Sequence, residues 1–344
     1  MVAEEQAVFQ SILRKLGNGQ DLSVEEAEKA TGYIMSGLAT PAQVAGFLTA
    51  LHLKGETTEE ITGCALAMRR AATRVQPKAS PLVDTCGTGG DGLGTFNIST
   101  AAAFVVAGAG VPVAKHGNRA ASSRSGSADV LEALGVNINA PPHVVSRCID
   151  EAGIGFLFAQ VFHPAMRHAA GPRRELGFRT VFNILGPLSN PAGATRQVLG
   201  VYDPSLTERM ARVLGLLGAE RALVVHGAGG MDELSTLGTT RVSELGGGKV
   251  VNYEIAPEDV GLGRARLEDL LGGAPEVNAR MVREVLDGVP GPRRDIVLLN
   301  AAAALVAADR ARSLREGIAL AAESIDSGRA RAALDALVEY SHGA

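Results

Sequence analysis

Residues 84 to 129 combine glycines, hydroxyl side chains and cations in the pattern of an anion-binding site. The stretch opens with Asp84-Thr-Cys-Gly-Thr-Gly-Gly-Asp91 and Asn97-Ile-Ser-Thr100, and it continues with Lys115-His-Gly-Asn-Arg119 and Ser122-Ser-Arg-Ser-Gly-Ser-Ala-Asp129. Glycines let the backbone of a loop approach an anion closely, and the first turn of a helix offers N–H donors at the positive end of its dipole. These residue types therefore predict a site for phosphate groups.

The hydrophobic pattern around these residues indicates the elements that position them. Residues 81 to 84, Pro-Leu-Val-Asp, predict a short strand that ends in the glycine loop, and residues 98 to 108 predict a helix entered through Asn, Ser and Thr. A second predicted strand, residues 111 to 114, ends in Lys115 and His116. Two successive strand ends therefore supply one predicted polyphosphate site.

The glycine loop also fits two other phosphate-binding patterns, which its surroundings do not support. Gly87, Gly89 and Gly92 satisfy Gly-x-Gly-x-x-Gly, but a dinucleotide fold needs an acidic residue about 20 positions farther on, where this chain has Lys115 and His116. No Gly-Lys-Ser or Gly-Lys-Thr closes the loop, so it is not a Walker-type P-loop. A simple tight turn remains an alternative for this loop alone, but it leaves the cations after the second strand unexplained.

Composition limits the classes of protein to which the chain can belong. With 344 residues, 46% of them hydrophobic, the chain is long enough for two domains with large cores. A net charge of −4 gives no electrostatic basis for binding nucleic acid or an anionic membrane. Cys64, Cys86 and Cys148 form no Cys-x-x-Cys pair and predict neither a disulfide framework nor a zinc site. The sequence shows no signal peptide and no apolar run of about 20 residues, so we expect a cytoplasmic protein.

Two kinds of hydrophobic periodicity divide the chain into two parts. The first 76 residues show only helical periodicity, with predicted helix starts at Ser23, Thr40 and Thr57. From Pro81 onward, short apolar strands alternate with helices. The predicted strands lie near residues 111–114, 155–159, 198–202 and 222–226, with a hairpin at 240–244 and 249–254. The predicted helices lie near residues 126–135, 142–152, 205–218, 277–288, 295–308 and 312–325. The pattern predicts an α/β fold: a small N-terminal helical domain plus a large α/β domain with a mainly parallel central sheet.

Taken together, the motifs resemble those of the anthranilate phosphoribosyltransferase family. The motifs between residues 84 and 129 are followed, in the order that the family has, by His163-Pro-Ala165, Arg173-Arg-Glu-Leu-Gly177, Arg179-Thr-Val-Phe-Asn183 and Asp232-Glu233. The resemblance extends over nearly the whole chain. It implies the nucleoside-phosphorylase-like fold of these transferases, in which residues 1–76 and a helical segment near 162–185 form one domain. Residues 77–161 and 186–344 then form the domain that binds the phosphoribosyl donor.

The resemblance also implies an activity. Members of the family transfer the phosphoribosyl group of 5-phosphoribosyl 1-pyrophosphate (PRPP) to the amine of anthranilate, giving N-(5-phosphoribosyl)anthranilate and pyrophosphate, in tryptophan biosynthesis. Breaking the bond between the sugar and pyrophosphate builds negative charge on the leaving group, so catalysis requires that this group be held and neutralised. The resemblance, together with the extensive apolar stripes of the N-terminal helices, also implies a homodimer. The net charge predicts no nucleic-acid or membrane partner.

By the same resemblance, three segments bind the donor: the glycine loop, the start of the helix at residue 98 and the loop after the second strand. The residues expected to contact PRPP are Gly87, Gly90, Asp91, Thr95, Asn97, Ser99, Thr100, Lys115, His116, Gly117, Asn118, Arg119, Ala120, Ala121, Ser122, Ser123 and Ser127. Lys115 is one of only six lysines, and its place at a strand end favours a charge aimed at phosphate over a solvated surface group.

Adjacent acids at Asp232 and Glu233 predict a magnesium site. They follow the predicted strand 222–226, at the carboxyl edge of the sheet, and proteins usually bind Mg²⁺ through one or two carboxylates together with substrate oxygens and water. The resemblance adds the hydroxyl of Ser99 as a third ligand and implies two Mg²⁺ ions per active site. A solvated surface pair or a helix cap is the alternative for such acids when they are considered alone.

The acceptor, anthranilate, has an amine that is already neutral at pH 7, so its attack requires neither a covalent nucleophile nor a strong base. Its carboxylate does require a cation, and Arg173 is the position that the family uses, with Gly87 and Asn118 nearby. His163 is a further candidate for an acceptor contact, and His116 is a candidate for a minor role in shuttling its proton. The alternative for both lone histidines is a structural role. The alternative for Arg173 is a solvated helix face with local ion pairs.

Other features leave different interpretations open. Gln160 and Phe162 depart from the residues that the family often has before His163, on the presumed acceptor channel.

Pyrimidine-nucleoside phosphorylases share the fold, but they are expected to lack both the run from Lys115 to Arg119 and the acidic pair. A non-catalytic relative that binds nucleic acid is a second alternative. It needs a basic surface and eroded motifs, and the sequence shows neither.

Overall fold

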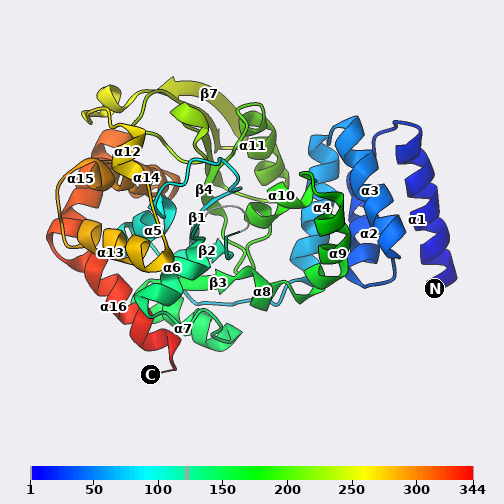
Figure 1. Cartoon of the computed structure of the whole chain (residues 1–344), viewed down its shortest axis with the longest axis horizontal. Coiled ribbons are helices and arrows are strands. Elements are labelled where there is room, and N and C mark those ends of the chain that lie inside the picture. The colour runs from blue at the N-terminus through cyan, green and yellow to red at the C-terminus, as the bar shows by residue number, and fades with distance from the viewer. Residues whose placement is uncertain (1, 121–123, 344) are drawn as a thin grey trace.

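The computed structural model describes residues 2–120 and 124–343, which form a helical bundle beside an α/β domain (Figure 1). The strands of this part of the chain are β1 (Val83–Gly87), β2 (Val113–Gly117), β3 (Ile154–Phe158), β4 (Arg196–Gly200), β5 (Arg221–His226), β6 (Thr240–Gly246) and β7 (Lys249–Ile255). In these residues they form one seven-stranded sheet in the order β3-β2-β1-β4-β5-β6-β7. β1 to β5 are parallel, and β6 and β7 add an antiparallel hairpin. The predicted mainly parallel sheet is confirmed.

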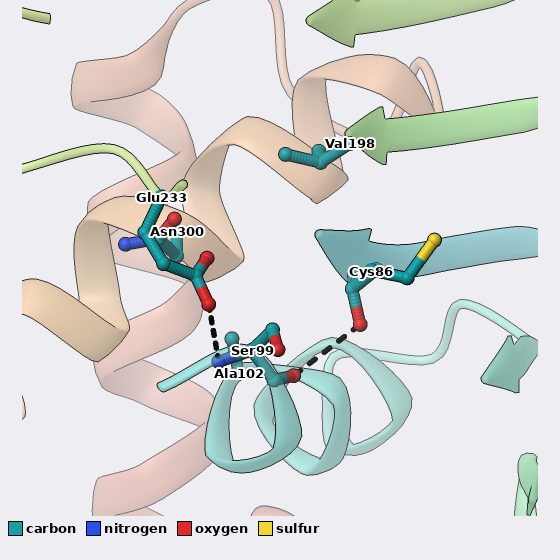
Figure 2. A pocket seen from close by; sticks show the side chains of 7 residues that line it. Cys86, Ser99, Ala102, Val198, Glu233 and Asn300 are labelled. Atoms are coloured by element: carbon teal, nitrogen blue, oxygen red, sulfur yellow. Dashed lines mark hydrogen bonds between the residues drawn. The ribbon is translucent and has the colours of Figure 1, made fainter. Parts of the chain in front are cut away.

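The strand order creates a topological switch point between β1 and β4. β2 and β3 lie on one side of β1, whereas β4 and β5 continue on the other side. The register places Gly87 at the end of β1 beside Gly200 at the end of β4. Figure 2 shows this edge, with Cys86 of β1 and Val198 of β4 near the start of α5 (Ile98–Gly108). In α/β proteins the crevice outside such strand ends is where ligands bind.

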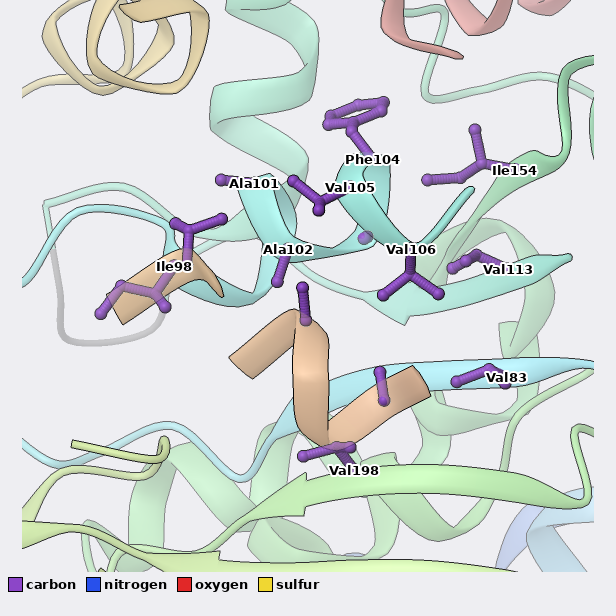
Figure 3. Close-up of a cluster of buried hydrophobic side chains, with 14 of the residues drawn as sticks. Val83, Ile98, Ala101, Ala102, Phe104, Val105, Val106, Val113, Ile154 and Val198 are labelled. Atoms are coloured by element: carbon purple, nitrogen blue, oxygen red, sulfur yellow. The ribbon is translucent and has the colours of Figure 1, made fainter. Parts of the chain in front are cut away.

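Helices cover both faces of the sheet, and each face has its own core. The other helices of the α/β domain are α6 (Ser127–Leu134), α7 (Pro142–Ala152), α11 (Leu206–Leu216), α12 (Leu267–Leu270), α13 (Pro275–Leu286), α14 (Pro292–Ala307), α15 (Leu314–Asp326) and α16 (Arg329–Ser341). The first core lies between the sheet and a layer that includes α5 and α14. Figure 3 shows Val106 of α5 in this core with Val83, Val113 and Val198 of three neighbouring strands. Leu199, the next residue of β4, points to the second core because successive side chains of a strand face opposite sides.

The N-terminal helices begin where their capping residues predict. They are α1 (Val2–Gly17), α2 (Val24–Met35), α3 (Pro41–Lys54) and α4 (Thr58–Ala71). Ser23, Thr40 and Thr57 each accept a hydrogen bond from the backbone N–H three residues later, and the side chain at that later position bonds back to complete a capping box. The three helix starts predicted from the sequence are confirmed. Among the described helices, none combines the length and apolar composition that crossing a membrane requires.

Short helices between β3 and β4 lead back toward the N-terminal helices (Figure 1). They are α8 (Ala159–Phe162), η1 (Pro164–Met166), α9 (Arg167–Leu176), α10 (Phe182–Leu185) and η2 (Gly186–Leu188). α9 contacts α2 and α3, and Ala169 and Phe182 share the second core with Ile34 and Leu48. That core continues through α11 to Leu199 of β4. These contacts accord with a helical domain that includes residues 162–185, although the domain boundaries remain a prediction.

Two elements differ from the expectation based on sequence. β2 extends to Gly117 instead of ending near residue 114, because Lys115 and His116 pair with β3. Lys115 therefore lies within a strand and not after it. The sequence pattern did not predict α16, since Gly328 gives its start no side-chain cap and its buried residues include two alanines and a serine beside Leu334 and Leu337. The other predicted elements agree with the structure to within a few residues.

Glu60 is a buried charge that joins several helix ends of the bundle. Its carboxylate accepts N–H bonds from Leu22 at 2.9 Å and Thr57 at 2.8 Å, and it pairs with the Nζ atom of Lys54 at 2.9 Å. We predict that Glu60→Ala lowers the free energy of unfolding by about 3–5 kcal/mol, because these buried donors lose their acceptor. Urea unfolding followed by far-UV circular dichroism measures the change. Glu59→Ala, at an exposed neighbouring position, is the control, and equal midpoints for the two variants would contradict the prediction.

Candidate active site

The segment that follows β5 crosses the carboxyl ends of β1 and β4 in close contact. A Cβ atom at Gly87 would lie 2.2 Å from the Oδ2 atom of Asp232, and one at Gly200 would lie 1.6 Å from the backbone oxygen of Asp232. Only glycine permits this approach at the two strand ends. The glycines thereby bring the acidic pair into the crevice at the switch point.

Asp232 turns toward the glycine loop. Its Oδ2 atom accepts a hydrogen bond from the backbone N–H of Gly89 at 2.7 Å. Burial, and then the nearby carboxyl group of Asp91, raise the pKa of Asp232 to about 7. Two carboxyl groups therefore lie close together beside the glycine loop, an arrangement that a bound cation would stabilise.

Glu233 turns instead toward the first turn of α5. Its Oε1 atom accepts a hydrogen bond from the backbone N–H of Ser99 at 3.2 Å (Figure 2). Burial, followed by repulsion from Asp232, raises the pKa of Glu233 to about 8. The N–H of Ser99 at the start of α5 thus already has a carboxylate partner.

Asn300 of α14 holds the acidic segment in place. Its Oδ1 atom accepts the N–H of Leu234 at 3.0 Å, and its Nδ2 atom donates to the carbonyl oxygen of Leu234 at 2.9 Å. Figure 2 shows Asn300 beside Glu233 in the wall of a small cavity, whose lining also includes Ser99 and Val198. The sequence motifs did not predict a role for Asn300. An asparagine inside an apolar, alanine-rich helix is a signal for it, because a buried amide needs partners.

Lys115 lies beneath the site and not on its surface. The residue is 2% exposed, and its Nζ atom donates to the carbonyl oxygen of Thr85 and, at 3.4 Å, to the hydroxyl oxygen of Ser99. Burial lowers the pKa of the Lys115 ammonium, whereas the carboxylates of Asp84 and Glu233 favour its charged form. The cation is therefore placed between a buried acid and the proposed metal ligands.

Asp84 is the buried acid, and the sequence analysis did not select it. It is fully buried, and its carboxylate accepts hydrogen bonds from the Nδ2 atom of Asn190 at 2.7 Å and from the backbone N–H of His116 at 3.1 Å. Burial raises the pKa of Asp84, and Lys115 opposes that shift. A charged residue in an otherwise apolar strand is the signal that indicates such a buried pair.

Acids of α6 hold the predicted donor residue Arg119. Its Nη1 atom donates to Asp129 and to Glu132, in both cases at 2.8 Å, and its guanidinium carbon lies 5.7 Å from the centre of the Phe158 ring. Arg119 is therefore already paired with carboxylates. The predicted donor contacts that lie outside the described residues are Ala121, Ser122 and Ser123.

The remaining predicted residues after β2 lie close to the end of that strand. Gly117 ends β2, and a Cβ atom there would lie 2.2 Å from the hydroxyl oxygen of Ser127. That hydroxyl donates to the carbonyl oxygen of Asn118 at 3.3 Å. Asn118, Ala120 and Ser127 therefore belong to one compact region next to the end of β2.

Asn97 and Thr100 lie at the start of α5, as predicted. The Nδ2 atom of Asn97 donates to the carbonyl oxygen of Ser125 at 3.2 Å, and its Oδ1 atom accepts from Asn278 at 2.9 Å. The hydroxyl of Thr100 is buried and has no hydrogen-bond partner in the described part of the chain. It remains available to a ligand or a water molecule.

Arg179 and Tyr202 are further residues at the glycine loop that sequence reasoning did not place there. The Nη2 atom of Arg179 donates to the carbonyl oxygen of Gly90 at 2.6 Å, and its guanidinium carbon lies 4.0 Å from the centre of the Tyr202 ring. Asp91 accepts the N–H of Leu93 at 3.2 Å within the same loop. Predicted residue Thr95, farther along, forms an isolated antiparallel bridge to Leu271, the residue after α12.

Two buried histidines meet near the second strand end. The ring centres of His116 and His163 are 5.0 Å apart. The Nδ1 atom of His116 lies 3.0 Å from the carbonyl oxygen of Gly186, so Nδ1 carries the proton and Nε2 keeps its lone pair. Neither Nε2 atom has a partner among the described residues. Burial lowers the pKa of His116 to about 3 and of His163 to about 4, so both rings are neutral at pH 7.

Arg173 lies near the end of α9, with its guanidinium carbon 5.3 Å from the centre of the Phe182 ring. Burial lowers its pKa, and no carboxylate among the described residues opposes that shift. The charge of Arg173 is thus free to meet an anion. Phe162, expected on the acceptor channel, is instead fully buried in the first core, whereas Gln160 is exposed.

The chain matches known proteins over almost its full length. Residues 10–72 match the helical bundle domain of a glycosyl transferase family, and residues 79–331 match the a/b domain of that family. An anthranilate phosphoribosyltransferase of Symbiobacterium thermophilum is 60% identical over 334 residues, which cover 97% of this chain and 98% of that protein. The crystal structure of the enzyme from Thermus thermophilus aligns with a TM-score of 0.92 at 52% identity, covering 96% of this chain and 99% of that chain. The enzyme from Saccharomyces cerevisiae in complex with PRPP and Mg aligns with a TM-score of 0.89 at 32% identity, covering 98% and 99% of the two chains.

These matches confirm the family resemblance that the motifs indicate. The two matching family models correspond to the helical domain and the α/β domain that the sequence predicts. They support a phosphoribosyltransferase and not the alternatives of a pyrimidine-nucleoside phosphorylase or a nucleic-acid-binding relative. The chain therefore belongs to the anthranilate phosphoribosyltransferase family of glycosyl transferases.

Proposed function

We propose that this chain is a cytoplasmic enzyme that transfers the phosphoribosyl group of PRPP to the amine of anthranilate, releasing pyrophosphate, in tryptophan biosynthesis. The observation that carries the proposal is the meeting of the glycine loop, the start of α5 and an acidic pair at one switch point of the sheet. A donor with a 5′-phosphate and a pyrophosphate needs several anion-binding elements close together, with carboxylates for a metal ion. The names of relatives that are 52–60% identical to the chain support this function.

The donor-binding residues follow from the elements that meet at the switch point. The glycine loop and the start of α5 supply backbone N–H groups and hydroxyls, and the end of β2 and the residues after it supply cations and amides. The proposed donor contacts within the described residues are Gly87, Gly90, Asp91, Thr95, Asn97, Ser99, Thr100, Lys115, His116, Gly117, Asn118, Arg119, Ala120 and Ser127. Lys115 acts on the donor phosphates from the protein interior, because its ammonium is buried beside Ser99.

The acidic pair fits Mg²⁺, and Asp232, Glu233 and Ser99 are the residues that would hold it. Both carboxylates are buried, and burial raises their pKa values by disfavouring the charged form, a cost that a bound cation would relieve. Within the described residues no three acidic, histidine or cysteine side chains converge on one point, so donor oxygens and water would complete the coordination. Because Asp232 faces Asp91 and Glu233 faces Ser99, we infer two ions. When bound, Mg²⁺ neutralises the charge that develops on pyrophosphate.

The chain's own residues orient the acceptor. As the bond from sugar C1 to pyrophosphate breaks, its electron pair leaves with pyrophosphate and the amine of anthranilate bonds to C1. The resulting ammonium group then releases its proton to water. The neutral Nε2 atom of His116 can accept a hydrogen bond from that amine, because its Nδ1 atom donates to a backbone carbonyl. Arg173 pairs with the carboxylate of anthranilate, and His163, Gly87 and Asn118 complete the acceptor site.

Replacing both acids tests the proposed reaction. We predict that Asp232→Asn/Glu233→Gln lowers kcat at least about 100-fold at ordinary Mg²⁺, since losing one electrostatic stabiliser raises a barrier by about 3–4 kcal/mol. The loss of anthranilate fluorescence on addition of PRPP and Mg²⁺ measures the rate. Glu4→Gln/Glu5→Gln, an exposed adjacent pair, is the control. Near-wild-type kcat for the first double variant across a Mg²⁺ titration would rule out the metal role.

Arg173 tests the acceptor site separately from the donor site. Arg173→Ala should raise the KM for anthranilate about 10- to 100-fold, because a charge-assisted hydrogen bond contributes about 1.5–3 kcal/mol. The Kd of PRPP with Mg²⁺, measured by calorimetry, should hardly change, whereas Lys115→Ala should weaken the donor and leave anthranilate unaffected. Arg174→Ala, at the exposed neighbouring position, is the control. Equal weakening of both ligands in Arg173→Ala would show that the residue holds the helix and not the acceptor.

We infer that the protein is a homodimer joined through the helical bundle. Exposed apolar side chains lie on α1, on α3 and just after α9, and they include Val8, Leu53 and Phe178, of which Leu53 is 79% exposed. We predict a dimer by sedimentation at micromolar concentration, and a monomer for Leu53→Glu, because a charge in an apolar interface is costly. Leu216→Glu, on α11, is the matched control and should stay dimeric. A monomeric wild-type protein would contradict the inference.

A further inference from the structure

One carboxylate, that of Asp129, binds both ends of the loop that follows β2. Its Oδ2 atom accepts the backbone N–H of Ala120 at 2.9 Å and the backbone N–H of Gly126 at 2.9 Å. Its Oδ1 atom accepts from the Nη1 atom of Arg119 at 2.8 Å. We call Asn118–Ala120 together with Gly126–Asp129 the neck of the donor loop. The side chain of Asp129 therefore joins the two segments of the neck.

The neck is closed by contact as well as by hydrogen bonds. A Cβ atom at Gly126 would lie 2.4 Å from the backbone nitrogen of Ala120 and 2.7 Å from the carbonyl oxygen of Asn118. The backbone N–H of Ala128 donates to that same oxygen at 3.2 Å. A side chain at position 126 would therefore force the two segments of the neck apart.

Asp129 remains charged in this position. Partial burial opposes ionisation, but the N–H groups of Ala120 and Gly126 and the guanidinium of Arg119 together hold the pKa of Asp129 below its ordinary value. Glu132, one turn later on α6, also pairs with Arg119 but reaches neither backbone N–H of the neck. Asp129 and Glu132 therefore both pair with Arg119, but only Asp129 binds the backbone of the neck.

We propose that Asp129 is a positioning residue for the phosphoribosyl donor: it keeps the neck closed in the shape that the donor's phosphates bind. The inference rests on the proposed function, because the neck contains the donor contacts Asn118, Arg119, Ala120 and Ser127. A loop end that is already held loses less conformational freedom when the ligand binds, so the donor binds more tightly. Asp129 itself need not touch the donor.

The test compares Asp129→Ala with Glu132→Ala. Asp129→Ala should raise both the Kd of PRPP with Mg²⁺, by calorimetry, and the KM for PRPP about 10- to 100-fold, with kcat within about threefold of wild type. Asp129→Asn should restore most of the affinity, because an amide oxygen still accepts both neck N–H groups. Glu132→Ala should bind the donor like wild type. Equal weakening by Asp129→Ala and Glu132→Ala would assign the effect to the Arg119 ion pair and overturn the proposal.

A second variant keeps the test decisive if Asp129→Ala folds poorly. Gly126→Ala opens the neck while leaving the carboxylate in place, and it should reproduce the loss of donor affinity without a matching loss of kcat. A lowered melting temperature with unchanged Kd for PRPP in these variants would show that Asp129 only caps α6, and would overturn the proposal. Failure of the wild-type protein to bind PRPP would instead contradict the proposed function, so the two failures are distinguishable.

Discussion

The site depends on the close contact between Asp232 and the glycines that end β1 and β4. Gly87 and Gly200 leave just enough room for the backbone and carboxylate of Asp232. This close approach keeps water away from the acidic pair, which is why burial raises the pKa values of Asp232 and Glu233. Carboxylates that are poorly solvated gain most from a bound cation. The contact that determines the geometry of the crevice therefore also makes the binding of a cation there favourable.

Buried charges beneath the crevice join residues of neighbouring segments. Lys115 lies within electrostatic reach of Asp84 and Glu233, and burying any one of these charges without a partner would cost several kcal/mol. Asp84 also accepts the N–H of His116, whose ring faces His163. One fully buried carboxylate thus interacts electrostatically with Lys115 and also accepts the backbone N–H of His116.

The second core determines where the helical bundle sits against the sheet. It runs from the N-terminal helices through α10 and α11 to β4 and β5. Arg69 of α4 reinforces it, because its side chain donates to the carbonyl oxygens of Leu188 at 2.7 Å and Leu217 at 2.9 Å. Arg173 belongs to the helices of this core, whereas the glycine loop and the acidic pair belong to the sheet. The packing of one apolar layer therefore sets the separation between the proposed acceptor cation and the proposed donor site.

The sequence by itself determined the features that depend on neighbouring residues. Capping residues and periodicity located the N-terminal helices and most strands, because these signals act over a few positions. The order of the motifs also placed the site at the carboxyl edge of a mainly parallel sheet. Tertiary structure alone decided that the adjacent acids Asp232 and Glu233 turn toward different elements, and that Lys115 is buried. It also gave Asp84 and Asn300 their roles, which depend on residues far away in the chain. The hydrogen-bond partners of Asp84 are 32 and 106 positions away, and the partner of Asn300 is 66 positions away. Such pairings arise only when distant strands and helices pack together, so no local pattern encodes them.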